Sequence, residues 1–238
     1  MVPTPTLSSR GGSTAARTNA LDKAGALQLP LAAIAIAIAS SVSLAFEVLL
    51  TRLFSLLFEY HYVFVATSLA ICGLGLGAAW GAWLLTHNNR TLVRPGGILV
   101  ALALALVFDS LVFSLLPWAG AVFVQVILAL PPFVLVGLLL STLFAARPAE
   151  SARLYASDLL GAAVGTVAVL LLIVWSGVFT AILWLALLAV LPALFLTYTS
   201  GDRQAFRWAG GTTALVVLLI IAGQVFDFPG FNAADISG

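Results

Sequence analysis

Charged residues are scarce in this chain of 238 residues, and their scarcity excludes most classes of protein. Only 8% of the residues are Asp, Glu, Lys or Arg, whereas 62% are apolar and the mean hydropathy is +1.16. A soluble domain carries roughly 25% charged residues, because its whole surface faces water. The composition therefore excludes a soluble enzyme and a disordered chain, and it indicates an integral membrane protein.

The chain also has few of the residues that build chemical sites. With one cysteine, Cys72, it can form no disulfide within the chain. A net charge of +1 and the absence of a basic stretch give no sign of a nucleic-acid interface. His61 and His87 fall in predicted loops on opposite sides of the membrane, each without a second ligand at useful spacing. We predict no metal site and no cofactor, with haem or pigment ligation as the alternative for these histidines.

Seven apolar stretches are long enough to cross a bilayer as helices, which takes about 20 residues each. They cover 31–57, 62–86, 97–116, 119–144, 156–175, 177–199 and 210–226. Continuous apolar runs favour helices over the alternating segments of a membrane barrel. We predict an all-α, multi-pass bundle of seven transmembrane helices over 30–226, with an N-terminal tail at 1–29 and a C-terminal tail at 227–238.

The distribution of basic residues predicts the orientation of the bundle. If the N-terminus is cytoplasmic, the inner segments hold nine of the ten Lys and Arg residues, and the outer loops and C-terminal tail hold none. Such an excess is typical of cytoplasmic loops. We therefore expect an N-inside, C-outside protein of the cell (inner) membrane. The nine residues are Arg10, Arg17, Lys23, Arg90, Arg94, Arg147, Arg153, Arg203 and Arg207.

The N-terminal tail is rich in Ser, Thr, Ala and Gly and has no apolar period. Alone, such a segment is expected to be disordered. It would become ordered if a neighbouring membrane subunit held it in place. We therefore expect the partners to be the lipid bilayer and other membrane subunits that contact this tail.

Small residues at four-residue spacing predict close helix packing, because they let two backbones approach each other in the membrane. Gly73, Gly77 and Gly81 form one such row, and Gly161 and Gly165 form a second. The pair at 131–132 is Pro-Pro, which should kink or interrupt the fourth helix.

The first predicted helix carries a polar stripe centred on Glu47. Helical spacing places five side chains on one face, and these are Ser40, Ser43, Glu47, Thr51 and Ser55. An ionisable residue at mid-helix costs about 2.5–3.5 kcal/mol. The stripe therefore predicts either a cation or proton site or a buried polar seam that orients packing.

Three further ionisable residues lie in or near the spans. Arg52 is expected either to snorkel to the interface or to pair with Asp109, which has no partner on its own helix face. The alternative for Asp109 is an unpaired, protonated side chain. Asp158, which follows Tyr155, stands near the start of the predicted fifth helix, where the helix dipole favours a carboxylate.

Two segments resemble a known family. The sequences Glu-Val-Leu-Leu-Thr-Arg at 47–52, followed by Gly-Leu-Gly-Leu-Gly at 73–77, and Leu-Tyr-Ala-Ser-Asp-Leu-Leu-Gly-Ala-Ala-Val-Gly at 154–165 resemble the polytopic region of membrane-bound spermidine-synthase-like proteins. In that family several helices precede an aminopropyltransferase-type domain. The resemblance spans about 40–200 and implies Glu47, Arg52, Tyr155 and Asp158 as signature positions. It implies shared ancestry of the helix bundle.

Synthase activity is not expected from this sequence. The 238 residues include no strand–Gly-loop–helix unit and no nucleophile–base pair. We therefore predict a non-catalytic membrane subunit, a scaffold or accessory component of a larger complex such as a bioenergetic or photosynthetic one. The alternatives are a carrier or binding bundle for a small cation such as a polyamine, and the membrane anchor of a truncated synthase-like enzyme.

Overall fold

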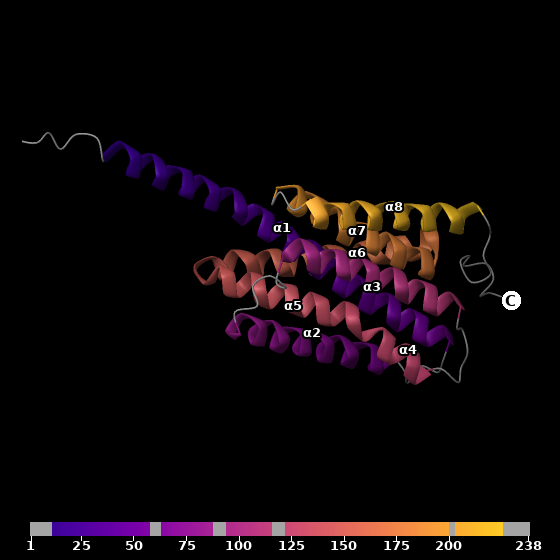
Figure 1. Cartoon of the computed structure of the whole chain (residues 1–238). Coiled ribbons are helices and arrows are strands. Elements are labelled where there is room, and N and C mark those ends of the chain that lie inside the picture. Colours follow the sequence, from indigo (N-terminus) through magenta and orange to yellow (C-terminus); the bar gives the residue numbers. More distant parts are fainter. Residues whose placement is uncertain (1–10, 58–62, 88–93, 116–121, 200–202, 226–238) are drawn as a thin grey trace, which may run out of the picture.

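The computed structural model describes residues 11–57, 63–87, 94–115, 122–199 and 203–225, and within these ranges the description omits the side chains of 11–28 and of a few residues at helix ends. The described residues are helical apart from short turns, and they contain no strand (Figure 1). The elements are α1 (Gly11–Leu57), α2 (Val63–Thr86), α3 (Pro95–Leu115), α4 (Val122–Leu128), α5 (Leu130–Ala146), η3 (Pro148–Glu150), α6 (Ser151–Ser176), α7 (Val178–Thr199) and α8 (Arg203–Val225).

Seven helical stretches are long and apolar enough to cross a membrane, which confirms the predicted all-α, multi-pass bundle. They are Leu29–Ser55, Phe64–Thr86, Pro95–Ser114, Val124–Ala146, Pro148–Ser176, Val178–Tyr198 and Arg203–Gly223. The fourth is made of α4 and α5, which are separated at Ala129, just before Pro131 and Pro132. The interruption predicted from the two prolines is therefore present.

The fifth and seventh spans begin earlier than the sequence predicts. They start at Pro148 and Arg203 rather than at 156 and 210. The added residues include Ala, Arg and Gln, which are good helix formers although they are not all apolar. Hydropathy marks only the apolar part of a helix, so it misses a polar turn that continues the same helix toward the interface.

Helix α1 is much longer than its apolar span. Its 47 residues correspond to about 70 Å, and it projects beyond the other helices at one end of the bundle (Figure 1). The prediction of a disordered tail is wrong for residues 11–29, which are helical. The cause is their content of Ala, Leu, Lys, Arg and Gln, whose helix propensity does not need an apolar period. Residues 1–10 lie outside the described residues, as do His61, most of the predicted loops and the tail at 227–238.

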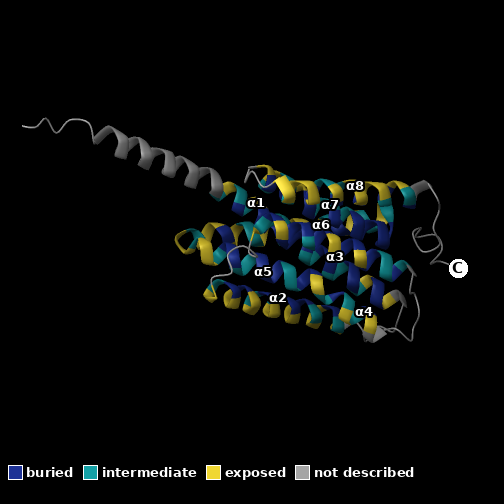
Figure 2. Ribbon diagram, viewed as in Figure 1, coloured by how far each residue is buried: buried dark blue, intermediate teal, exposed yellow. Residues whose placement is uncertain are grey.

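The core of the bundle is formed by α1, α3 and α7, while α6 and α8 lie at its periphery. More than half of each of the three central spans is buried, compared with 17% for the span of α6 and 22% for that of α8 (Figure 2). Phe46 of α1 and Phe133 of α5 meet in the core, with ring centroids 5.4 Å apart. Peripheral helices therefore present long apolar faces to whatever surrounds the bundle.

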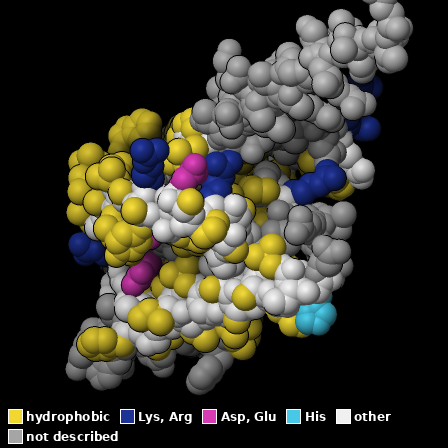
Figure 3. All heavy atoms as spheres, turned by 90° about the vertical axis from the view of Figure 1, so that its left-hand side faces the viewer, with side chains coloured by type: hydrophobic (Ala, Val, Ile, Leu, Met, Phe, Trp, Pro, Cys, Tyr) yellow, Lys and Arg dark blue, Asp and Glu magenta, His cyan; other side chains and the backbone are white. Residues whose placement is uncertain are grey.

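The ends of the bundle differ in charge. Arginine side chains gather in the view of the end of the bundle at which α1, α3, α6 and α8 begin (Figure 3). The arginines of this end are Arg94, Arg147, Arg153, Arg203 and Arg207. Helix α1 begins at this end and α8 finishes at the opposite one (Figure 1). Seven spans therefore place the start of α1 and the end of α8 on opposite sides of a membrane, and which side is cytoplasmic stays a prediction from the basic residues.

Candidate intramembrane polar site

Helices α1 and α6 are joined by two serine hydroxyls. Ser40 Oγ donates a hydrogen bond to Asp158 Oδ1, and Ser41 Oγ donates to the carbonyl oxygen of Gly161 at 2.5 Å. Asp158 is the eighth residue of α6, whereas the helix dipole acts mainly within the first turn. The helix dipole therefore does not explain the position of Asp158, because α6 begins seven residues before it. Instead, the carboxyl group of Asp158 accepts a hydrogen bond from the hydroxyl of Ser40.

Two glycines allow this close approach. A Cβ at Gly161 would overlap the backbone of Ala37, and one at Gly165 would overlap the backbone of Ser41. Both contacts advance by four residues in the same direction, so α1 and α6 run parallel. The short side chain of serine reaches across only because no side chain stands between the two backbones.

The second glycine row packs α2 against α5. Added Cβ atoms at Gly73, Gly77 and Gly81 would collide with Phe133, Val134 and Ser141 respectively. Gly137 of α5 fits against the backbone of Leu74 in return. Sequence reasoning missed Gly137 because it stands alone among bulky residues, and its role appears only when the facing helix is known.

The polar stripe of α1 is not a continuous network. Thr51 and Ser55 donate to carbonyl oxygens of their own helix, those of Val48 and Arg52, at 2.7 and 2.8 Å. Glu47 is partly exposed and makes no hydrogen bond or ion pair with the described residues. Of the five predicted members, only Ser40 bonds to another helix within the part of the chain that the structure describes.

Asp109 is the most deeply buried carboxyl group that the structure describes. Its side chain is 0% exposed, and neither carboxyl oxygen has a hydrogen-bond partner within the described part of the chain. The next residue, Ser110, is buried too, but its hydroxyl donates to the carbonyl oxygen of Phe179 at 3.2 Å. An unsatisfied buried polar group is rare in native proteins, so Asp109 calls for an explanation.

The predicted pair between Arg52 and Asp109 does not form. Arg52 is exposed near the end of its span, whereas α3 packs chiefly on α7 and α5 and not on α1. The alternative, that Arg52 snorkels to the membrane interface, stays a prediction. Tyr155 is also 56% exposed, on the outer side of α6.

The described residues contain no group of three His, Cys, Asp or Glu side chains that could hold a metal ion. His87 is exposed, stacks on Trp83 with ring centroids 4.6 Å apart, and has Nδ1 3.0 Å from the carbonyl oxygen of Trp83. No protein-family model, curated protein or solved structure matched the chain. The candidate polar features are the buried carboxyl group of Asp109, the partly exposed carboxyl group of Glu47, and the hydrogen-bonded seam at which Ser40 and Ser41 of α1 contact α6.

Proposed function

We propose that the chain is a non-catalytic integral membrane subunit that serves as a scaffold or accessory component of a larger membrane complex. The observation that supports this proposal is Glu47, a partly exposed carboxyl group without a polar partner among the described residues. It lies eight residues inside the end of the span Leu29–Ser55. An acidic residue at mid-helix costs about 2.5–3.5 kcal/mol in lipid, and a donor on a neighbouring subunit would offset that cost.

The face proposed for this contact is formed by α1 and α6. Ser40 faces α6, and Glu47 stands seven residues later on nearly the same side of α1. The outer side of α6 is apolar and unusually exposed, including Leu160, Val164 and Leu171. The resemblance to spermidine-synthase-like proteins implies Glu47, Arg52, Tyr155 and Asp158 as signature positions, and all four belong to α1 or α6.

Photo-cross-linking in native membranes tests this proposal. A photoreactive amino acid replaces Leu160 or Val164 on α6, and the matched control replaces the equally exposed Ile71 on α2. We expect a discrete protein adduct from α6, reduced by Glu47→Gln, and lipid adducts alone from α2. A chain that gives no protein adduct at any position, and that purifies from mild detergent as a lone monomer, would contradict the proposal.

A second candidate function, a binding bundle or carrier for a small cation such as a polyamine, is favoured by Asp109. A buried carboxylate without a partner is costly, and a cationic ligand would compensate it. Under this hypothesis spermidine raises the melting temperature of the purified protein saturably, and Asp109→Asn abolishes that rise. The control variant Glu150→Gln retains it, because the partly exposed Glu150 is already paired with Arg147 at 3.2 Å. A melting temperature that spermidine leaves unchanged in the parent protein would exclude this candidate.

A further inference from the structure

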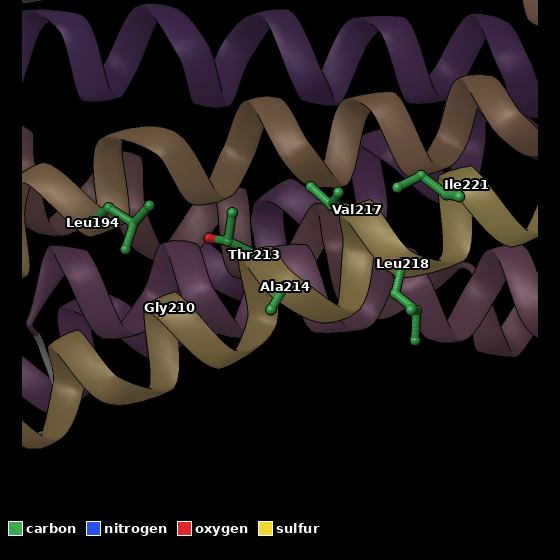
Figure 4. A pocket seen from close by; sticks show the side chains of 7 residues that line it. All are labelled: Leu194, Gly210, Thr213, Ala214, Val217, Leu218 and Ile221. Atoms are coloured by element: carbon green, nitrogen blue, oxygen red, sulfur yellow. The ribbon is translucent and has the colours of Figure 1, made fainter.

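A shallow groove runs along the outer surface between α7 and α8. It has a volume of about 500 Å³ and is lined almost entirely by apolar atoms (Figure 4). Its single polar lining group, the hydroxyl of Thr213, donates to the carbonyl oxygen of Ala209 at 2.8 Å and is therefore already satisfied. The lining residues are Leu194 of α7 and Gly210, Thr213, Ala214, Val217, Leu218 and Ile221 of α8.

Small residues create this groove at its end nearest the start of α8. Gly210 has no side chain, and a Cβ added there would meet no other described atom within 4 Å. From Gly210 to Ile221 the helix rises by about 16 Å, which is about half of the 30 Å hydrocarbon core and so matches one leaflet of a bilayer. A single acyl chain that enters from the interface fits such a groove along its length.

Two arginines continue the lining of the groove toward the membrane surface. Arg203, Arg207, Gly210, Ala214 and Ile221 follow one another at spacings of four, three, four and seven residues, which places them on one face of α8. Both guanidinium groups are exposed, and neither forms an ion pair with another described residue. The groove therefore leads to two positive charges that no acidic side chain within the described ranges pairs with.

The surroundings of these arginines are typical of a membrane interface. Tyr198 and Phe206 are exposed beside them, with ring centroids 6.0 Å apart, and aromatic side chains concentrate at the level of lipid headgroups. The arginines also belong to the basic end of the bundle (Figure 3). Basic side chains at a junction between transmembrane helices bind anionic headgroups.

We propose that the groove between α7 and α8 is a binding site for an anionic phospholipid. The acyl chain lies along Gly210, Ala214, Val217 and Leu218, and the headgroup phosphate is bound by Arg203 and Arg207. Arginine suits this role because its planar guanidinium group binds phosphate oxygens in a bidentate manner. Charge complementarity selects an anionic lipid over a zwitterionic one, while the groove selects a lipid over a free phosphate.

Native mass spectrometry of the full chain, released from detergent with phosphatidylglycerol or phosphatidylcholine of identical acyl chains, tests the proposal. We expect one phosphatidylglycerol to be retained under activation that removes phosphatidylcholine. The double variant Arg203→Gln/Arg207→Gln should weaken phosphatidylglycerol binding by roughly thirtyfold, since each basic residue near the membrane surface contributes about fivefold. Arg153→Gln removes an exposed charge of α6, away from the groove, and should leave binding unchanged.

A second pair of variants tests the groove separately from the charges. Gly210→Leu adds a bulky side chain to the lining of the groove, whereas Gly75→Leu adds the same side chain to α2, outside the groove. A Cβ at either position meets no other described atom within 4 Å, so neither substitution is expected to disturb packing. Only Gly210→Leu should weaken phosphatidylglycerol binding, and glycerol 3-phosphate without acyl chains should not compete. Equal retention of both lipids, an equal loss in Arg153→Gln, or full competition by glycerol 3-phosphate would each overturn the proposal.

Discussion

Most hydroxyl groups in the described parts of the spans donate to their own helix, and few of them connect one helix to another. Thr142 donates to Leu139 and Thr166 donates to Ala162, each within the same helix. Ser40 instead bonds to Asp158, a residue 118 positions away in the chain. Such a bond fixes the register of two helices, because both partners must stand at the same depth.

Ser40→Ala is therefore expected to destabilise the bundle. The substitution leaves the partly buried carboxyl group of Asp158 without its donor, and an unsatisfied buried acceptor costs about 1–3 kcal/mol. The matched control is Ser43→Ala, three residues along the same stripe, where the described residues provide no hydrogen bond to lose. Thermal unfolding in detergent should show a lower melting temperature for Ser40→Ala alone. Equal melting temperatures for the two variants would mean that the seam does not depend on this bond.

The sequence predicts which face of a helix is polar, but it does not predict what meets that face. Spacing alone placed Ser40 and Glu47 on one stripe. The pairing of Ser40 with Asp158, and the lack of a hydrogen-bond donor for Asp109 among the described residues, depend on which helices are neighbours. The expected pair of Arg52 and Asp109 fails for this reason, since α3 packs on α7 and α5 rather than on α1.

At the scale of helices, the apolar spans and the break before Pro131 were predictable because each follows from local chemistry. Hydropathy measures transfer of one segment into lipid, and proline removes a backbone donor from its own helix. The helical part of residues 11–29 was not predictable from apolar periodicity, because its formation depends on propensity. Likewise, Gly137 becomes informative only when α2 faces it.

Glycine-to-alanine substitutions should distinguish a glycine that close helix packing requires from a glycine that only lowers helix propensity. Gly77→Ala places a methyl group against the backbone of Val134 and should destabilise the bundle by about 1–3 kcal/mol, the usual cost of overpacking. Gly75→Ala, two residues earlier in α2, meets no described atom and should be neutral or stabilising by up to about 1 kcal/mol. Equilibrium unfolding in mixed detergent measures both. Equal tolerance of Gly77→Ala and Gly75→Ala would mean that α2 and α5 do not pack through Gly77.

Across the whole molecule, both the basic residues and the uncovered apolar surface are unevenly distributed. Basic residues gather at the end where α1 and α8 begin (Figure 3), and the peripheral helices α6 and α8 remain largely uncovered. The first asymmetry predicts the orientation in the membrane. The second supports lipid and partner subunits as the molecules that complete the surface, with α1 and α6 proposed for protein and α7 and α8 for lipid.

The most direct test of the whole account is the side of the membrane on which each end of the chain lies. In a Cys72→Ser background, Ser9→Cys and Ser237→Cys each provide one thiol for a membrane-impermeant maleimide. We predict that Ser237→Cys is labelled on cells whose wall and outer membrane have been removed while the inner membrane stays intact. Ser9→Cys should be labelled only after the inner membrane is permeabilised. Labelling of both ends from the same side would contradict a bundle of seven spans, and the reverse pattern would contradict the orientation predicted from its basic residues.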